Sequence, residues 1–86
     1  MKIQVFGTHC GACKTMNQNV DEAVRQTGLD CSVERVTRIL DMIEHGVTGT
    51  PALKINGELK SVGRALDVET IKGLLANAVP KQEVLP

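Results

Sequence analysis

Residues 3–14 read Ile3-Gln4-Val5-Phe6-Gly7-Thr8-His9-Cys10-Gly11-Ala12-Cys13-Lys14. This stretch places two cysteines between a short apolar run, which predicts a buried strand over residues 2–6, and the start of a helical pattern. A thiol in the first turn of a helix meets unpaired backbone N–H groups and the positive end of the helix dipole, which favour the thiolate. A second thiol three residues later lies one turn away, so the pair could close a small disulfide ring. Two such cysteines can carry two electrons or bind one metal ion.

The composition indicates one small domain with an aliphatic core. The chain has 86 residues, of which 42% are hydrophobic, with a single Phe and neither Trp nor Tyr. Ten acidic residues balance ten basic ones. Binding to a polyanion depends on an excess of Lys and Arg, so we expect neither nucleic acid nor an anionic membrane as a partner. We expect a monomer.

The cysteine content and the first residues bear on location. Met1 leads directly into the first strand without the roughly 7–15 apolar residues of a signal peptide. No run approaches the roughly 20 apolar residues of a transmembrane helix. We therefore expect a cytoplasmic protein, where structural disulfides are rare and a closely spaced cysteine pair is catalytic or metal-binding. The third cysteine, Cys31, is expected to be a small buried hydrophobe.

Three segments have apolar residues at helical spacing. The first follows the cysteine loop and ends at Gly28; its apolar positions are Met16, Val20, Ala23, Val24 and Thr27. The second is expected to be capped by Thr37 and to end at Gly46; its positions expected to face inward are Ile39, Leu40, Met42 and Ile43. The third is capped by Asp67 and stopped by Pro80; its apolar positions are Val68, Ile71, Leu74, Leu75 and Ala78. Since Cys13 shares the apolar side of the first helix and Cys10 does not, we expect Cys13 to be shielded and Cys10 exposed.

The remaining segments predict strands. Residues 31–36 follow the first helix after a short crossover, which indicates a strand parallel to the first. Residues 52–55 and 58–62 flank Asn56-Gly57, the preferred pair for a type I′ hairpin turn. The predicted order is therefore β-α-β-α-β-β-α, an α/β domain over residues 1–78 followed by a flexible tail over residues 79–86.

With these elements in place, the chain resembles the thioredoxin superfamily in its small, glutaredoxin-sized form. The resemblance extends from Met1 to about Asn77. Three blocks carry it, and together they are much more specific than one Cys-x-x-Cys: residues 7–14 (GTHCGACK), residues 46–52 (GVTGTPA) and Gly63-Arg64. The resemblance implies a four-stranded mixed sheet of order 2-1-3-4, with the first and third helices on one face and the second helix on the other.

The resemblance also implies a site. Pro51 would be the cis proline that faces the cysteine pair in this fold, and Thr50 would offer its backbone to an extended substrate. Gly63 either allows a close backbone approach there or is a simple turn glycine. Cys10 would be the nucleophile and Cys13 the resolving thiol.

Four neighbours of the cysteines belong to this candidate site: His9, Gly11, Ala12 and Lys14. His9 and Lys14 add positive charge, although the helix terminus supplies the main effect on the thiolate. Thioredoxins carry Trp and Pro where this chain has His9 and Ala12, so the reduction potential does not carry over. The position of their buried acid falls near Gln4, which cannot ionise.

The expected function is a thiol–disulfide oxidoreductase that needs no cofactor and no metal beyond its own dithiol. Its partners would be a disulfide-containing protein or a small thiol, and a reductase or low-molecular-weight thiol. Two alternatives remain. One is a copper or zinc carrier using the same cysteines, which Thr8, the second helical pattern and Thr50-Pro51 disfavour. The other is a non-catalytic binding module with the same groove.

Overall fold

The chain folds into seven elements in the expected order. The computed structural model describes residues 1–8 and 11–78. The strands are β1 Lys2–Phe6, β2 Ser32–Val36, β3 Ala52–Ile55 and β4 Glu58–Val62, and the helices are α1 Gly11–Thr27, α2 Ile39–Glu44 and α3 Val68–Ala78. None of these helices is long and apolar enough to cross a membrane. The tail predicted over residues 79–86 lies outside the described residues.

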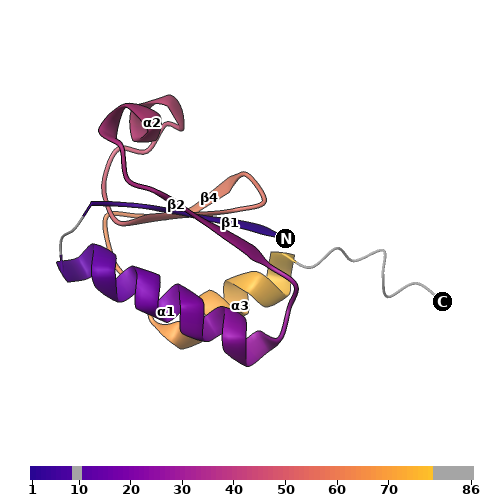
Figure 1. Cartoon of the computed structure of the whole chain (residues 1–86). Helices are drawn as coiled ribbons and strands as arrows, with labels where there is room; N and C mark the ends of the chain where they lie inside the picture. The colour runs from indigo at the N-terminus through magenta and orange to yellow at the C-terminus, as the bar shows by residue number, and fades with distance from the viewer. Residues whose placement is uncertain (9–10, 79–86) are drawn as a thin grey trace.

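The four strands form one mixed sheet of order β2-β1-β3-β4, as expected. Strand β1 pairs with β2 in parallel and with β3 antiparallel. The β3–β4 hairpin turns at Asn56 and Gly57, both of which have positive φ as a type I′ turn requires. Because β1 and β2 are parallel, their carboxyl ends lie together, and the segments that follow the two strands leave the sheet at the same end (Figure 1).

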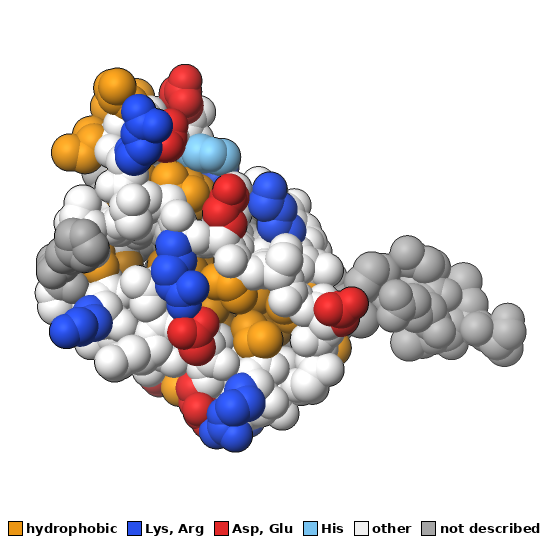
Figure 2. Space-filling view, viewed as in Figure 1, with side chains coloured by type: hydrophobic (Ala, Val, Ile, Leu, Met, Phe, Trp, Pro, Cys, Tyr) orange, Lys and Arg blue, Asp and Glu red, His pale blue; other side chains and the backbone are white. Residues whose placement is uncertain are grey.

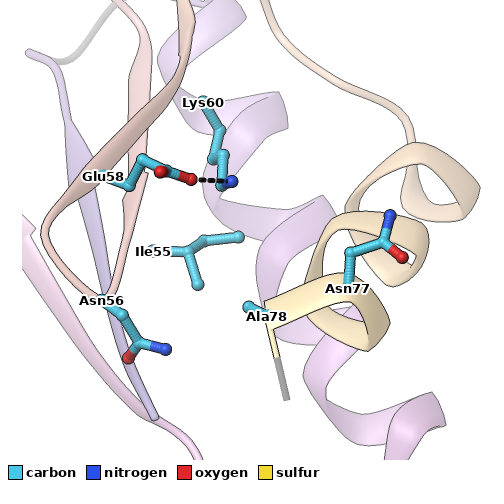
Figure 3. Close-up of a pocket in the computed structure, with 6 residues that line it drawn as sticks. All are labelled: Ile55, Asn56, Glu58, Lys60, Asn77 and Ala78. Carbon is cyan, nitrogen blue, oxygen red and sulfur yellow. Dashed lines mark hydrogen bonds and ion pairs between the residues drawn. The ribbon is translucent and has the colours of Figure 1, made fainter. Parts of the chain in front are cut away.

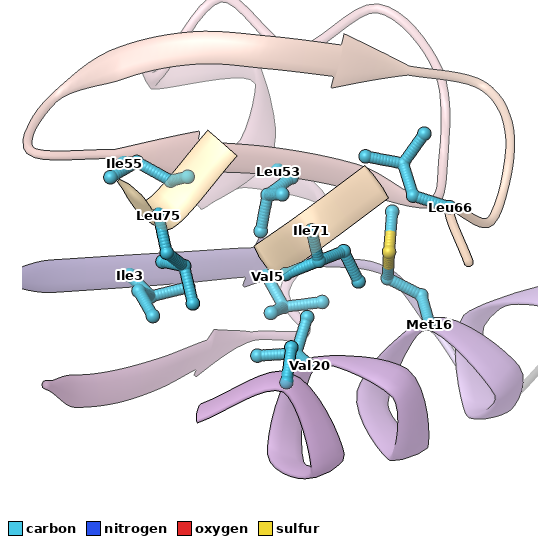
Figure 4. Close-up of a cluster of buried hydrophobic side chains, with 10 residues drawn as sticks. Ile3, Val5, Met16, Val20, Leu53, Ile55, Leu66, Ile71 and Leu75 are labelled. Carbon is cyan, nitrogen blue, oxygen red and sulfur yellow. The ribbon is translucent and has the colours of Figure 1, made fainter. Parts of the chain in front are cut away.

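The main core lies between the sheet and the pair α1 and α3, which cover the same face (Figure 1). Alternate residues of β1 and β3 point to this face and meet the buried sides of both helices (Figure 4). The labelled members of the cluster are Ile3, Val5, Met16, Val20, Leu53, Ile55, Leu66, Ile71 and Leu75. Burial of these aliphatic side chains is the main stabilising contribution, and it holds the amino-terminal turn of α1 against the end of β1.

Helix α2 covers the opposite face, at the carboxyl end of β1 and β2 (Figure 1). A second, smaller cluster holds it there, formed by Phe6, Val36, Met42, Val47 and Ala52. The resemblance therefore predicted correctly how the helices divide between the two faces.

Two expectations about α2 are wrong. The residue that caps it is Arg38, without a side-chain capping bond, and not Thr37. Of the four apolar residues expected to face inward, only Met42 does so; Ile39, Leu40 and Ile43 are exposed. The physical reason is that a helix of six residues presents only a narrow side to the sheet, and Met42 occupies that side in the buried cluster with Phe6.

Asp67 caps α3, as predicted: its Oδ1 accepts the backbone N–H of Thr70 at 2.7 Å. Hydrogen bonding to Thr70 lowers the pKa of the Asp67 carboxyl from its ordinary value of 3.8.

A carboxyl group whose pKa is lower in the folded than in the unfolded state stabilises the fold at pH values above the unfolded-state pKa. This contribution disappears as the pH falls through the folded-state pKa. We expect Asp67→Ala to lower the thermal midpoint at pH 7, with the gap to wild type closing below about pH 4. Asp67→Asn, which keeps an acceptor, is the control; equal midpoints for Asp67→Ala and wild type at pH 7 would contradict this role.

Candidate active site

Cys13 is buried on the inner side of α1, with an exposed fraction of 1%. It shares that side with Met16 and Val20, which anchor the helix in the main core. The expectation that Cys13 is shielded is therefore confirmed. Cys10 and His9, the other residues predicted at this turn, lie outside the described residues.

Gly7 closes the space next to the Cys13 thiol. A Cβ atom at Gly7 would lie 2.6 Å from Cys13 Sγ, closer than side chains approach without movement, and 3.1 Å from Cys13 Cβ, which is also a tight contact. The Gly7 N–H donates to the carbonyl of Val36 at 3.0 Å, which extends the pairing of β1 with β2 by one residue. Gly7 thus holds the backbone directly against the sulfur. No role for Gly7 was predicted from the sequence, although a glycine between a buried strand and a Cys-x-x-Cys is a usable signal.

Pro51 approaches the same point from the other side. The Thr50–Pro51 peptide bond is cis, as expected, and Pro51 is fully buried while Thr50 is exposed. The Cα of Pro51 lies 3.9 Å from the position of a Cβ on Gly7, the same position that contacts the Cys13 sulfur. Cys13, Gly7 and Pro51 therefore meet at one place, although they come from α1, the end of β1 and the start of β3.

Gly63 secures the Pro51 segment. Its N–H donates to the Pro51 carbonyl at 2.9 Å, and its φ of 85° lies in the left-handed region that favours glycine. A Cβ at Gly49 would lie 3.6 Å from the Gly63 Cα and 3.3 Å from Val62 Cγ1, so the two loops also touch at Gly49. Gly63 combines the two expected possibilities, since its N–H pairs with Pro51 and its backbone makes a turn.

The amino terminus of α1 provides a positive electrostatic environment. Its first turn contains no acidic residue that could neutralise the helix dipole. Gly11, Ala12 and Lys14 are all exposed there, so these predicted neighbours of the cysteines face solvent rather than the core. The Thr15 hydroxyl donates to the Gly11 carbonyl at 3.1 Å within this turn.

Gln4, near which the resemblance places a buried acid, is a hydrogen-bond donor to a carboxylate instead. Its Nε2 donates to Glu34 Oε1 at 2.8 Å, and Gln4 is buried while Glu34 is exposed. Lys2 Nζ lies 3.9 Å from the same Glu34 oxygen. The carboxamide is therefore used to hold an exposed carboxylate on the neighbouring strand, and it cannot accept a proton from a thiol.

Cys31 lies away from this site. It precedes β2 at the end of the sheet opposite to Gly7, with its Sγ 3.9 Å from the Met1 Sδ. It is half-buried, less than the full burial that the sequence predicted. Burial raises the pKa of the Cys31 thiol, which keeps it protonated and poorly nucleophilic at neutral pH.

A shallow pocket of about 200 Å³ lies at the same far end of the molecule, between the β3–β4 turn and the end of α3 (Figure 3). Its lining residues are Ile55, Asn56, Glu58, Lys60, Asn77 and Ala78, and Glu58 and Lys60 form an ion pair within it. It is smaller than the roughly 300–1,000 Å³ of most ligand pockets, and no cysteine lines it. Within residues 1–8 and 11–78, no three His, Cys, Asp or Glu side chains are grouped so that they could hold a metal ion.

Comparison with known proteins gives a family match over most of the chain. The model of the family described as "Thioredoxin domain" matches residues 1–76. The chain is 40% identical over 76 residues to a thioredoxin of Methanothermobacter thermautotrophicus, which covers 88% of this chain and 99% of the relative. It is 33% identical over 70 residues to a thioredoxin of Methanocaldococcus jannaschii, covering 81% of this chain and 80% of the relative.

Solved structures share the fold at low sequence identity. Thioredoxin-2 of a malaria parasite superposes with a TM-score of 0.67 at 16% identity, covering 88% of this chain and 81% of that one. The germline-specific thioredoxin Deadhead of Drosophila melanogaster superposes with a TM-score of 0.64 at 17% identity, covering 91% and 80%.

Proposed function

Since the chain belongs to the thioredoxin domain family and is a thiol–disulfide oxidoreductase, we propose that Cys10 and Cys13 are its redox-active pair. Cys10 immediately precedes Gly11, the first residue of α1, which suits a thiolate stabilised by the helix terminus. Cys13 is buried one turn later. An accessible thiol followed by a shielded one suits a nucleophile followed by a resolving thiol.

The proposed reaction has two exchange steps. The Cys10 thiolate attacks one sulfur of the substrate disulfide, forms a mixed disulfide and releases the first substrate thiolate, which takes up a proton. Cys13, after losing its proton, attacks the Cys10 sulfur, releases the second substrate thiolate and closes the Cys10–Cys13 disulfide. The substrate gains two electrons and the protein dithiol loses two. A reductase or a low-molecular-weight thiol then restores the dithiol.

Substrate binding is proposed at Thr50, Pro51 and Gly63. The observation that best supports this site is the meeting of Cys13, Gly7 and Pro51 at one point. Thr50 is exposed directly beside it, so an extended segment of a substrate can reach the Thr50 backbone while its disulfide lies at the cysteines. The bond from Gly63 to the Pro51 carbonyl keeps this segment in place. The substrate would be a disulfide-containing protein or a small disulfide.

A redox titration tests the proposed pair. We expect equilibration in dithiothreitol buffers of increasing oxidation to convert Cys10 and Cys13 together, with the slope of a two-electron couple, while Cys31 stays a thiol. Alkylation followed by mass spectrometry of peptides reports each cysteine separately. Independent oxidation of Cys10 and Cys13 would contradict the proposal. Stoichiometric copper or zinc bound through both cysteines after anaerobic purification would favour the carrier.

A further inference from the structure

The outer side of α2 carries three large aliphatic side chains that the fold leaves in solvent. The exposed fractions are 65% for Ile39, 68% for Leu40 and 63% for Ile43. We call these three residues the α2 apolar face. In Figure 2 hydrophobic side chains gather on the projection that α2 forms in Figure 1. A contiguous exposed apolar patch in a small protein often marks an interaction site.

The three residues form one continuous face because of helical geometry. At about 100° per residue, Ile39, Ile43 and Leu40 fall within an arc of about 100° of the α2 circumference. Met42 lies outside that arc and turns inward, with an exposed fraction of 5%. The inner side is used in packing, since Met42 belongs to the buried cluster with Phe6, and the ring centroids of Phe6 and His45 lie 5.1 Å apart. The α2 apolar face therefore has no place in the core of this chain.

The position of α2 connects this face to the redox site. Helix α2 follows the end of β2, and Val36 of β2 accepts the N–H of Gly7, the residue that contacts Cys13. The chain continues from this helix through residues 45–49 to Thr50 and Pro51. Helix α2 therefore lies at the same end of the sheet as the redox site, within reach of a partner whose backbone lies along Thr50 (Figure 1).

The size of the face indicates the kind of occupant. A stable interface between two copies buries about 800 Å² on each partner and uses about 20–30 residues a side, whereas transient redox encounters use less. Three side chains on a helix of six residues are far fewer than a stable interface between two copies needs. At about 100° per residue, Asp41 and Glu44 of this helix fall outside the arc of the three aliphatic residues, so no charge interrupts the face. Asp41 Oδ2 lies 3.9 Å from Nε of Arg38, the residue that caps the helix. The occupant should therefore be apolar and transient.

We propose that the α2 apolar face docks an apolar segment flanking the disulfide of the substrate protein. The proposal rests on the proposed function, because the mixed disulfide at Cys10 would hold the partner while this contact orients it. Protein substrates with apolar flanks should then be reduced faster than those with polar flanks, because their flanks contact the α2 apolar face. Small disulfides, which cannot reach α2, gain nothing from it.

Two matched peptides test the proposal. Each has a central intramolecular disulfide with eight residues on either side; one carries Leu and Ile in its flanks and the other Ser and Asn at the same positions. Eight extended residues reach about 26 Å, well beyond the 12.8 Å radius of gyration of the chain, so the flanks can reach α2. The measurement is the second-order rate constant for reduction by the pre-reduced protein. Bis(2-hydroxyethyl) disulfide serves as the small substrate.

We expect wild type to reduce the apolar-flanked peptide about tenfold faster than the polar one, which corresponds to about 1.4 kcal/mol. The triple variant Ile39→Gln, Leu40→Gln, Ile43→Gln should reduce both peptides at the slower rate and should keep the wild-type rate with the small disulfide. The control is Leu59→Gln, which removes a large aliphatic side chain that is 40% exposed on β4, away from α2. It should keep the tenfold preference.

Each other outcome has a definite meaning. Equal rates for the two peptides with wild type would overturn the docking proposal, but would not affect the proposed thiol–disulfide exchange at Cys10 and Cys13. No reduction of the small disulfide by wild type would instead refute the proposed chemistry. A dimer in sedimentation velocity that the triple variant dissolves would assign the α2 apolar face to a second copy, and binding of wild type alone to phosphatidylcholine vesicles would assign it to a membrane. Either result would overturn the proposal.

Discussion

Replacement of Cys10 by Ser is expected to reduce the rate of disulfide reduction to background, a loss on the order of 10³-fold or more. A serine hydroxyl is not ionised at neutral pH, so it cannot replace a thiolate that the terminus of α1 stabilises. The remaining thiols cannot compensate, because Cys13 is shielded and burial raises the pKa of Cys31. Turnover of a small disulfide measures the loss.

The companion variant Cys13→Ser separates the two roles. It keeps the nucleophile and lacks the resolving thiol, so mixed disulfides with substrate or glutathione should accumulate at Cys10 and be visible by mass spectrometry. In the reduced wild type at pH 7, alkylation should be fast at Cys10 and slow at Cys13 and Cys31, because the thiolate is the reactive species and access limits the rest. Stable adducts at Cys13 in the Cys10→Ser variant would reverse the assigned roles, and a fully active Cys10→Ser variant would refute the oxidoreductase reading.

Much of this fold could be predicted because its local signals agree with its packing. Asn56-Gly57 can adopt positive φ at both positions, and the hairpin forms there. Asp67 can cap a helix, and its Oδ1 does so. The long helices α1 and α3 each bury one side along their length, so their periodicity is easily recognised.

The α2 segment shows where such reasoning fails. Apolar residues at 39, 40, 42 and 43 fit an inward face by spacing alone, yet three of the four are exposed. Periodicity indicates which residues share a side of a helix but not how much of that side the sheet can cover. A helix of six residues makes too few contacts for the pattern to decide its orientation. In this chain the three residues that were wrongly expected to face inward lie on the helix next to the site. Their exposed apolar face is the surface that we propose docks the substrate.

The candidate site was predictable only in part, for a related reason. The cysteine pair and Thr50-Pro51 are visible as motifs, each within a few residues. The contact that joins them involves Gly7, which lies six residues before Cys13 and 44 before Pro51. A glycine has no side chain to give a chemical signal, so its importance appears only when its neighbours are placed in space.

Gly7 therefore provides the second large expected effect. Gly7→Ala places a methyl group 2.6 Å from Cys13 Sγ and 3.1 Å from its Cβ, so the buried Cys13 side chain or the Gly7 backbone has to shift. Overpacking of this kind costs about 1–3 kcal/mol of the free energy of unfolding. If the sulfur is displaced instead, resolution of the mixed disulfide slows and the adduct at Cys10 lives longer. Chemical denaturation measures the first effect, and quenched-flow trapping measures the second.

The matched control is Gly73→Ala. Gly73 is an exposed residue within α3, and a Cβ there would meet nothing within 4 Å. Since alanine favours helix over glycine, this substitution should stabilise the protein by about 0.5–1 kcal/mol without changing the adduct lifetime. The two variants add the same methyl group and should move stability in opposite directions. If Gly7→Ala were as stable as wild type and resolved its mixed disulfide at the same rate, the backbone at Gly7 would not be what positions Cys13, and the contact with Pro51 would lose its place in the mechanism.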